Sequence, residues 1–406
     1  MSGREFFETR TVAEARTGFR PTRRTRVEEV PLAQALHRVP AEDIGSPHPL
    51  PGFAKSTVDG YAVRAADTYG ASDSLPTYLE LAGAVRMGTE PDVAVRPGTA
   101  VAIPTGGVIP AGADAVVMVE HTAETMPGTI EVTRAAAPGG NVVRADEDVP
   151  AGGVLAPAGR PLRASDLGLL AAAGVTRVPV HARPCVVIVS TGDEVVPPTE
   201  QQLRPGQVRD ATASALAGLV TDAGGEPVLA GIVPDDAHLL EAALREGLEH
   251  ADLLVVSAGS SVGARDQTAG VVAKLGEIWC HGIAVKPGKP TLLADCGGVP
   301  LLGLPGNPLS ALVVFRLLGV PLVWQLAGCD QPPPEPMTRG RLVRAVPSVA
   351  GRTDVVQVTL RDGTVEPIFG SSALLSVLTR ADGYLVVPEP ATGLDAGTEV
   401  EVTLYR

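Results

Sequence analysis

Between residues 50 and 148, apolar and polar residues alternate in short runs that are separated by Gly and Pro. The runs at 115–119 and 129–133 are examples, and such alternation is typical of strands with one buried face. We therefore expect a small β-rich domain over 50–148. The flanking stretches 27–49 and 149–181 are polar, contain Pro and hold short helical patterns, and we expect them to form a second, linking domain together.

A different pattern extends from residue 182 to residue 328. Continuous apolar runs at 185–189, 253–256 and 301–304 predict strands that are buried on both faces. Helical patterns lie between these runs, the clearest over 237–250. This alternation predicts a doubly wound α/β domain with a parallel sheet, and ligands bind such sheets outside the carboxyl ends of the strands.

A proline-rich segment at 331–336 predicts a stiff linker after the α/β domain. Short alternating runs resume beyond it, at 354–360, 384–387 and 399–404. These runs predict a β-barrel or sandwich domain over 329–406. The fold class expected for the whole chain is therefore multidomain, α/β plus β.

Net charge limits the partners that this chain can have. The 406 residues include 33 basic and 46 acidic side chains, giving a formal net charge of −13. Sequence-independent nucleic-acid binding depends on many contacts from Lys and Arg to phosphates, so this chain is a poor candidate for it. The dense basic cluster at 20–26 is short. We expect no nucleic-acid partner.

Secretion and membrane insertion are not indicated either. The first 20 residues carry charges where a signal peptide needs an apolar segment. The longest apolar stretch, 309–326, is interrupted by Arg316 and Pro321, which predicts a buried helix rather than a membrane span. The four cysteines lack disulfide or zinc spacing and are expected to be reduced thiols. We expect a cytoplasmic protein with no membrane partner.

Small and acidic residues follow the first predicted buried strand, in the segment Ser190-Thr-Gly-Asp-Glu194. Glu194 is compatible with a hard cation such as Mg²⁺, which prefers oxygen ligands, and equally with a solvated acid at a turn. A run of small residues from Ser257 to Gly263 follows the next strand and allows the backbone to approach an anionic ligand closely.

Three aspartates precede predicted helices and have two interpretations each. Asp266 precedes a helix predicted over 268–275, and Asp235 and Asp236 precede the helix over 237–250. Each aspartate is compatible with a helix N-cap and with a role at the ligand site.

Two of the chain's four lysines lie in the loop Lys286-Pro-Gly-Lys-Pro290. Like charges three residues apart repel each other unless an anion lies between them, so we interpret Lys286 and Lys289 as a site for phosphate or another oxyanion. The segment Leu304-Pro-Gly-Asn-Pro-Leu309 opens a predicted helix, whose first amides also favour anions. Asn307 is compatible with capping this helix and with binding.

Together these loops predict a metal-assisted site for a multiply phosphorylated or otherwise anionic ligand. The reaction class that they favour is phosphoryl-type transfer or hydrolysis. The chain contains neither a P-loop G-x-x-x-x-G-K-[ST] nor a G-x-S-x-G motif. Ser190 and Ser257 have no His nearby in the sequence, so nucleophilic serine catalysis is disfavoured.

The same loops, in the same order, resemble the MoeA family of molybdopterin molybdenumtransferases, which includes the gephyrin E domain. The resemblance covers nearly the whole chain, and the combination of motifs is far more specific than any one of them. The segments that carry it are Asp59-Gly-Tyr-Ala-Val-Arg64, Thr105-Gly-Gly107, Gly112-Ala-Asp-Ala-Val-Val117, Glu147-Asp148, Ser190 to Glu194, Gly206 to Asp210, Ser261 to Gly263 with Asp266, the Lys286 loop and Leu304 to Pro308.

The resemblance implies an elongated subunit with a MogA-like doubly wound α/β domain built from 1–26 and 182–328, a β-rich insertion domain and a C-terminal β-barrel. It implies a homodimer whose active site lies between the β-rich domain of one subunit and the α/β and C-terminal domains of the other. It also implies the reaction: adenylylated molybdopterin is hydrolysed with Mg²⁺, AMP leaves and molybdate enters the dithiolene. An adenylyltransferase of the same pathway is an expected partner.

Residues that match the family's motifs carry the family's roles as expectations. The resemblance implies catalytic roles for Asp59, Thr105, Asp148, Glu194, Asp235, Asp266, Lys286 and Lys289, with Glu194 and Asp266 as metal ligands. It implies substrate binding by Ser190, Gly192, Gly259, Ser261, Gly263, Pro305, Gly306, Asn307, Arg352 and Ser376, of which Arg352 and Ser376 match more loosely.

The chain departs from the family's pattern at Lys55, Ala258, Ser260 and Gly282. These departures motivate an alternative function, a binding or carrier paralogue that holds molybdopterin or its molybdenum form without efficient turnover. Retention of the principal carboxylates and loop lysines argues against it. A third hypothesis, an adenylyltransferase like the stand-alone relatives of the α/β domain, leaves the flanking β domains unexplained.

Overall fold

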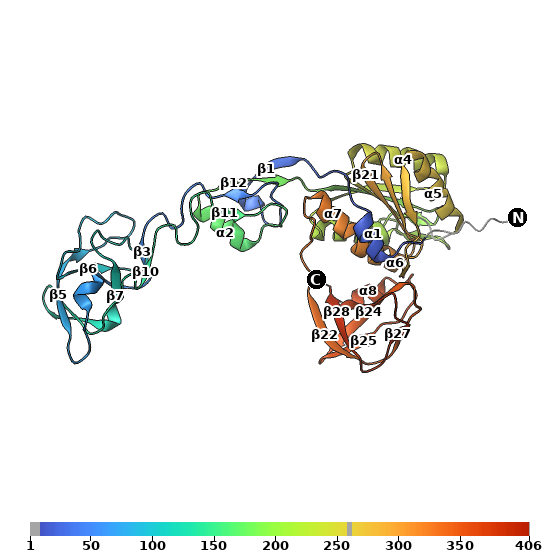
Figure 1. The fold of residues 1–406 in the computed structure, drawn as a ribbon. Coiled ribbons are helices and arrows are strands. Elements are labelled where there is room, and N and C mark those ends of the chain that lie inside the picture. Colours follow the sequence, from blue (N-terminus) through green and yellow to red (C-terminus); the bar gives the residue numbers. More distant parts are fainter. Residues whose placement is uncertain (1–8, 258–261, 406) are drawn as a thin grey trace.

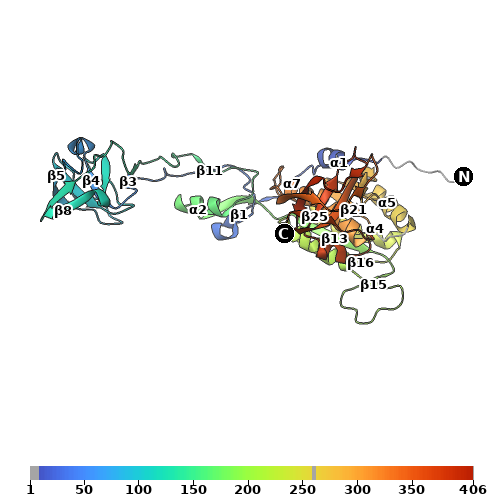
Figure 2. The same ribbon diagram turned by 90° about the horizontal axis from the view of Figure 1, so that it is seen from below.

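The computed structural model describes residues 9–257 and 262–405, with side chains described except at 262–266. The subunit is elongated, with the β-rich domain at one end and the α/β domain and barrel at the other (Figures 1 and 2). A two-stranded ribbon leads out of the α/β domain, in which β1 (Val27–Pro31) pairs antiparallel with β12 (Arg177–His181).

The β-rich domain is built on a six-stranded sheet in the order β7-β4-β6-β5-β9-β8. Buried apolar side chains such as Leu79, Val101 and Ile130 form its core. The strands are β4 (Gly60–Val63), β5 (Thr77–Ala84), β6 (Thr99–Ile103), β7 (Ala115–Met118), β8 (Thr122–Met126) and β9 (Thr129–Val132), with 3-10 turns at Ala65–Thr68 and Val119–His121. The alternating runs at 115–119 and 129–133 therefore form strands, as predicted.

The linking domain is small and lies between the ribbon and the β-rich domain (Figure 1). Leu162 and Leu170 are among the residues of its buried core. Its elements are the strand pair β2 (Ile44–Gly45) and β11 (Val154–Ala156), the helix α2 (Ala164–Ala172) and a 3-10 turn at Leu32–Gln34. The pair β3 (Lys55–Ser56) and β10 (Val142–Val143) lies in the β-rich domain, at its border with the linking domain.

The α/β domain contains a six-stranded sheet in the order β16-β13-β17-β21-β20-β18. Its strands are β13 (Cys185–Thr191), β16 (Glu226–Val233), β17 (Leu253–Ser257), β18 (Glu277–His281), β20 (Leu292–Cys296) and β21 (Val299–Leu304). The prediction of a parallel sheet holds for the first four strands in this order and is wrong for β20, which runs antiparallel to both neighbours. Gly297 and Gly298 have φ +67° and +86°, which closes β20 and β21 into a tight hairpin.

Helices cover both faces of this sheet. Side chains of α4 (Ala237–His250) pack with Val187 and Val189 on one face, and side chains of α3 (Ala211–Asp222) pack with Val186 and Ile188 on the other. The other helices of the domain are α1 (Val12–Gly18), α5 (Val262–Leu275), α6 (Pro308–Val314) and α7 (Val320–Leu326). A short pair of strands, β14 (Val195–Val196) and β15 (Val208–Arg209), closes a loop beside the sheet.

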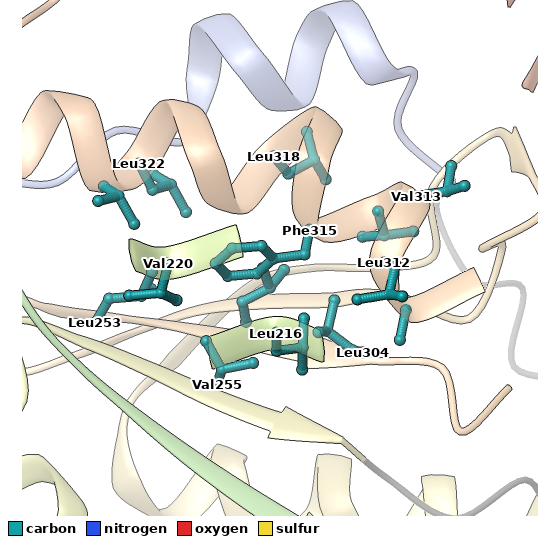
Figure 3. Close-up of a cluster of buried hydrophobic side chains, with 14 of the residues drawn as sticks. Leu216, Val220, Leu253, Val255, Leu304, Leu312, Val313, Phe315, Leu318 and Leu322 are labelled. Carbon is teal, nitrogen blue, oxygen red and sulfur yellow. The ribbon is translucent and has the colours of Figure 1, made fainter. Parts of the chain in front are cut away.

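The long apolar stretch forms a continuous helical segment, Pro308–Leu326, with a π turn at Phe315–Gly319 between α6 and α7. The segment is long and apolar enough to cross a membrane, but about two thirds of it (67%) is buried inside the protein. Figure 3 shows Phe315 between side chains of α3 and the sheet, among them Leu216 and Leu304. The predicted buried helix is confirmed.

The C-terminal domain is a barrel, one of the two forms predicted. Its sheet order is β19-β24-β25-β22-β28-β26, and an additional pairing of β24 with β26 closes it. The strand β19 (Val285–Lys286) belongs to a loop of the α/β domain and pairs in parallel with β24. The remaining elements are β22 (Met337–Leu342), β23 (Val346–Pro347), β24 (Thr353–Arg361), β25 (Thr364–Pro367), α8 (Ser376–Arg380), β26 (Gly383–Val387), β27 (Gly393–Leu394) and β28 (Glu399–Leu404).

Candidate active site

The loop after β13 has a conformation that favours glycine at its first position. Gly192 has φ +139°, and a Cβ at this position would lie 2.6 Å from Oε2 of Glu194. The N–H of Gly192 donates to the carbonyl of Val233 at the end of β16, at 3.1 Å. Gly192 thus ties together the carboxyl ends of two neighbouring strands and places Asp193 and Glu194 at that edge of the sheet.

Three carboxylates influence one another at this edge. Oδ1 of Asp193 accepts a hydrogen bond from the backbone N–H of Asp235 at 3.0 Å. Partial burial, together with the negative charges of Asp193 and Glu194, raises the pKa of Asp235 above its usual value. Concentrated negative charge favours a bound cation, and carboxylates with shifted pKa values are frequent at functional sites.

The neighbouring Asp236 caps helix α4. Its Oδ1 accepts hydrogen bonds from the backbone N–H groups of Leu239 and His238, at 3.0 and 2.8 Å. These two bonds lower the pKa of Asp236, because they stabilise its charged form. Capping and a role at the ligand site were open for both aspartates, and the structure assigns the cap to Asp236.

The hydroxyl of Ser190 lies at the carboxyl end of β13. The residue is 3% exposed, and its Oγ has no hydrogen-bond partner among the described residues. Buried hydroxyl groups in proteins are normally paired. Ser190 therefore offers a polar group that a ligand at this strand end would satisfy.

Part of the expected site lies beyond what the structure describes. Gly259 and Ser261 fall outside the described residues, and for Gly263 and Asp266 the backbone alone is described, within helix α5. Asp266 is the fifth residue of this helix, so the alternative of Asp266 as its N-cap is wrong. The apolar pattern indicates the helix only from residue 268 onward, because its first turn contains small residues that carry no periodic signal.

The lysine loop joins the α/β domain to the barrel. It connects β18 to β20, and its strand β19 pairs with β24 so that Lys286 lies opposite Asp354. Gly288 has φ +128°, and a Cβ there would lie 2.3 Å from Cγ2 of Val314 in α6. The loop is therefore held tightly from two sides, while Lys286 and Lys289 remain exposed.

Asp354 lies between two of the expected cationic residues. Its Oδ1 accepts a hydrogen bond from Nε of Arg352 at 2.7 Å, and its Oδ2 accepts one from Nη2 of Arg352 at 3.2 Å. Nζ of Lys286 lies 3.9 Å from the same Oδ2. The carboxylate of Asp354 thus forms a charge cluster between the lysine loop and β24 of the barrel.

The loop from Pro305 to Asn307 also contacts the barrel. Asn307 occupies the N-cap position of α6, but its side chain makes no capping bond, and Nδ2 donates instead to Oγ of Ser372 at 3.0 Å. Ser376, which the sequence indicated, is exposed at the start of α8. Ser372, rather than Ser376, lines the cavity between the domains.

The cavity between the α/β domain and the barrel has a volume of about 810 Å³. Gln357 also lines it, with 3% of its surface exposed and its Nε2 unpaired among the described residues. The expected residues on its wall are Lys286, Lys289, Pro305, Asn307 and Arg352. The structure therefore brings together cations from two separate segments, the lysine loop and the barrel, around one hollow.

Three expected residues lie at the other end of the molecule. Asp59 precedes β4, and its Oδ1 accepts hydrogen bonds from N–H and Oγ1 of Thr105, at 2.7 and 3.1 Å. These bonds lower the pKa of Asp59. Asp148 is exposed where the β-rich and linking domains meet, and its N–H donates to the carbonyl of Leu50. Within one subunit, the lysine loop is far from this group (Figure 1).

The donor set at the sheet edge suits a magnesium ion in its chemistry. Asp193, Glu194 and Asp235 supply hard oxygen atoms, the ligands that Mg²⁺ prefers. Among the described residues, no three His, Cys, Asp or Glu side chains are arranged to hold a metal ion. Mg²⁺ commonly takes one or two carboxylates and completes its coordination with substrate phosphates and water, so the incomplete set is of the expected kind.

Sequence reasoning missed Asp193, Ser372 and Asp354. Asp193 stands beside the selected Glu194, so its position in the same loop was the available signal. Asp354 had a clearer signal, because an acid at the start of a strongly apolar strand needs a partner once it is buried. Ser372 had no signal of its own, since its role depends on how the barrel docks against Asn307.

Family models match almost the full length of the chain. The MoeA N-terminal region (domain I and II) matches residues 10–174, a model described as "Probable molybdopterin binding domain" matches 187–325, and the MoeA C-terminal region (domain IV) matches 339–405. A molybdopterin molybdenumtransferase from Bacillus subtilis is 33% identical over 398 residues, covering 93% of this chain and 90% of that protein. The chain belongs to the MoeA family.

Other MoeA relatives agree in length and in fold. Molybdopterin molybdenumtransferase 2 from Mycobacterium tuberculosis is 34% identical over 406 residues, covering 97% of both chains. A crystal structure of a molybdopterin biosynthesis MoeA protein from Pyrococcus horikoshii superimposes with a TM-score of 0.86 at 30% identity, covering 98% of this chain and 100% of that one. The multidomain α/β plus β fold is thus the fold of the MoeA family.

Proposed function

We propose that this MoeA protein is a cytoplasmic molybdopterin molybdenumtransferase of molybdenum cofactor biosynthesis. It would insert molybdenum from molybdate into adenylylated molybdopterin and release AMP. The observation that carries the proposal is the hollow between the α/β domain and the barrel, where Lys286, Lys289 and Arg352 meet at one wall. The names of the relatives support the same transferase reaction.

The carboxylates and the Pro305 loop lie at the same edge of the sheet and would contact different parts of the substrate. The carboxylates lie beyond β13 and β16, and the loop of Pro305 lies beyond β21, two strands from β13. With strands about 4.8 Å apart, the two groups are separated by roughly 10 Å, a span that an adenylylated pterin can bridge. Lys286, Lys289 and Arg352, which line the same cavity as Pro305, then neutralise the oxyanion. The carboxylates beyond β13 and β16 hold the metal.

Glu194 and Asp235 are the described carboxylates that we assign to magnesium, with Asp266 as a further ligand. When bound, Mg²⁺ neutralises phosphate charge and so favours departure of AMP. The raised pKa of Asp235 follows from its partial burial and from the neighbouring carboxylates, and such an arrangement is maintained at a cost that cation binding offsets. The hydroxyl of Ser190 is positioned at the same strand end to orient the substrate.

The active site is shared between two subunits in this proposal. Asp59, Thr105 and Asp148 lie on the end of the molecule remote from the lysine loop, so one subunit alone does not bring the two groups together (Figures 1 and 2). A homodimer that places the β-rich domain of one subunit over the cavity of the other completes the set. An adenylyltransferase of the same pathway supplies the adenylylated substrate.

One observation favours the carrier alternative. Gly282 is one of the departures from the family's pattern, and its φ of +127° is a conformation that favours glycine, so no charged side chain stands at this position near Lys286. Fewer cations weaken the stabilisation of developing negative charge. A carrier that binds molybdopterin without turnover would tolerate this.

Turnover with defined substrates separates the two functions. Adenylylated molybdopterin, Mg²⁺ and molybdate are added to the purified protein. The release of AMP and the formation of molybdenum cofactor are then measured in the same samples. The transferase predicts AMP release that depends on molybdate. Tight binding of molybdopterin with no molybdate-dependent AMP release would reject the transferase and support the carrier.

A further inference from the structure

Asp354 is a deeply buried acid at the edge of the cavity between the α/β domain and the barrel. It is 2% exposed, lies in β24 and pairs in register with Lys286 of β19. Its carboxylate receives two hydrogen bonds from Arg352 and approaches the ammonium group of Lys286 to 3.9 Å. All three residues line the cavity between the α/β domain and the barrel.

The two cations of this cluster are much less buried than the acid between them. The Arg352 side chain is 33% exposed and the Lys286 side chain 60% exposed, against 4% for Asp354. A buried ion pair is a poor stabilising device, because well-packed apolar residues of similar size usually serve stability as well or better. In this arrangement the buried carboxylate instead holds two accessible cations in place, and the exposed parts of both cations face the cavity.

The net charge of the cluster determines how strongly it attracts an anion. Lys286 and Arg352 contribute two positive charges and Asp354 one negative charge, so the three side chains together carry +1. A doubly charged oxyanion entering the cavity meets this reduced charge rather than two unshielded cations. Binding is then strong enough to hold the anion and weak enough to let it leave for the next step.

We propose that Asp354 sets the oxyanion affinity of this cavity and acts as a positioning residue for Arg352 and Lys286. The proposal rests on the proposed function in one respect, namely that the oxyanion is molybdate. Asp354 itself does not touch the anion; it acts through the two cations that it holds.

Replacement of Asp354 by Asn separates this role from a structural one. The variant Asp354→Asn keeps the size of the side chain but raises the charge of the cluster to +2, so a dianion is bound more tightly, by roughly ten-fold or more at an effective dielectric near 20. The same change replaces one of the two carboxylate oxygens that accept from the guanidinium of Arg352 by an NH2 group, which cannot accept, so the guanidinium is held less firmly. We therefore expect a lower Kd for molybdate together with at least a roughly ten-fold lower kcat for AMP release.

Molybdate alone is the probe, and its Kd is measured by equilibrium dialysis with the full chain. Asp354→Glu, which restores the negative charge, is expected to bring the Kd back toward that of the unaltered chain. Asp362→Asn serves as the matched control, because it removes one acid from an exposed turn of the same barrel and is expected to leave the Kd unchanged. A Kd that is unchanged or higher in Asp354→Asn, with the melting temperature preserved, overturns the proposal.

A second variant keeps the test decisive if Asp354→Asn does not fold. Arg352→Gln removes a cation that is one-third exposed, and we expect a Kd for molybdate at least roughly ten-fold higher. An unaltered Kd in this variant also overturns the proposal. Because these binding measurements need no adenylylated molybdopterin, failure of AMP release in every sample would reject the proposed function while leaving the affinity result intact.

Discussion

At the scale of single residues, Asp235 and Asp236 show how two adjacent acids acquire opposite properties. The backbone amides of α4 stabilise the charge of Asp236, whereas partial burial and the negative charges of Asp193 and Glu194 disfavour the charge of Asp235. One acid therefore supports the fold, and the other is held in a position that the fold alone does not favour. Such local conflicts are characteristic of functional sites.

We expect Asp235→Asn to raise the melting temperature slightly at pH 7 and to lower AMP release at least roughly ten-fold. Because the folded pKa of Asp235 is raised, its cost to the fold is absent below the ordinary pKa of 3.8 and appears as the pH rises through the folded value. The stabilisation should therefore disappear as the pH falls toward 4. Thermal unfolding at several pH values measures it, and a lower melting temperature at pH 7 would contradict this account.

Asp236→Ala is the matched variant with the opposite expectation. It removes the acceptor of two backbone N–H groups at the start of α4, so the melting temperature should fall by a few degrees. The lowered pKa of Asp236 means that this contribution is present above pH 3.8 and is lost as the pH falls through the folded value. Molybdate affinity of the folded variant should stay unchanged, and a large loss of affinity would show that the cap is not its main role.

At the scale of elements, the lysine loop depends on the fit between a turn and a helix. Gly288 lies against Val314 of α6, and β19 is paired with β24 of the barrel. The loop thus couples α6, the helix after β21, to β24 of the barrel. Its lysines owe their positions to contacts on both sides.

We expect Gly288→Ala to destabilise the protein by about 1–3 kcal/mol, because the added Cβ would overlap the Val314 side chain and the backbone has φ +128°. The molybdate Kd should rise in the same variant as the loop moves. Gly270→Ala is the control, since α5 leaves open space at this helical glycine, and a gain of up to about 1 kcal/mol is expected there. Equal effects of the two variants in chemical denaturation would refute the role of the close contact.

At the scale of the whole molecule, the separation of two groups of site residues requires a partner subunit. We expect that Asp59→Asn and Lys289→Ala homodimers are each inactive but regain activity when mixed and allowed to exchange subunits. Random exchange gives half heterodimers, each with one intact site, so about a quarter of the original activity should return. AMP release before and after exchange measures this, and no recovery despite confirmed exchange would mean that each site belongs to a single subunit.

The sequence predicted the elements well where periodicity was strong, as in α4 and β13. It did not predict the antiparallel β20, because a short buried strand has the same apolar pattern in either direction and the hairpin depends on two glycines. At the site, loops at strand ends were found because their residue types are unusual. Ser372 and Asp354 were not found, because their importance arises from docking of the barrel against the α/β domain.

The ribbon of β1 and β12 has a consequence for the order in which the chain folds. Val27 lies opposite His181, so everything between them leaves and re-enters the α/β domain at one place. Helix α1, which packs through Ala15 and Phe19 into the same core as Phe315, is synthesised about 300 residues before that partner. Helix α1 therefore stays without its packing partner while the chain is synthesised, and the linking and β-rich domains are completed before the α/β domain to which α1 belongs.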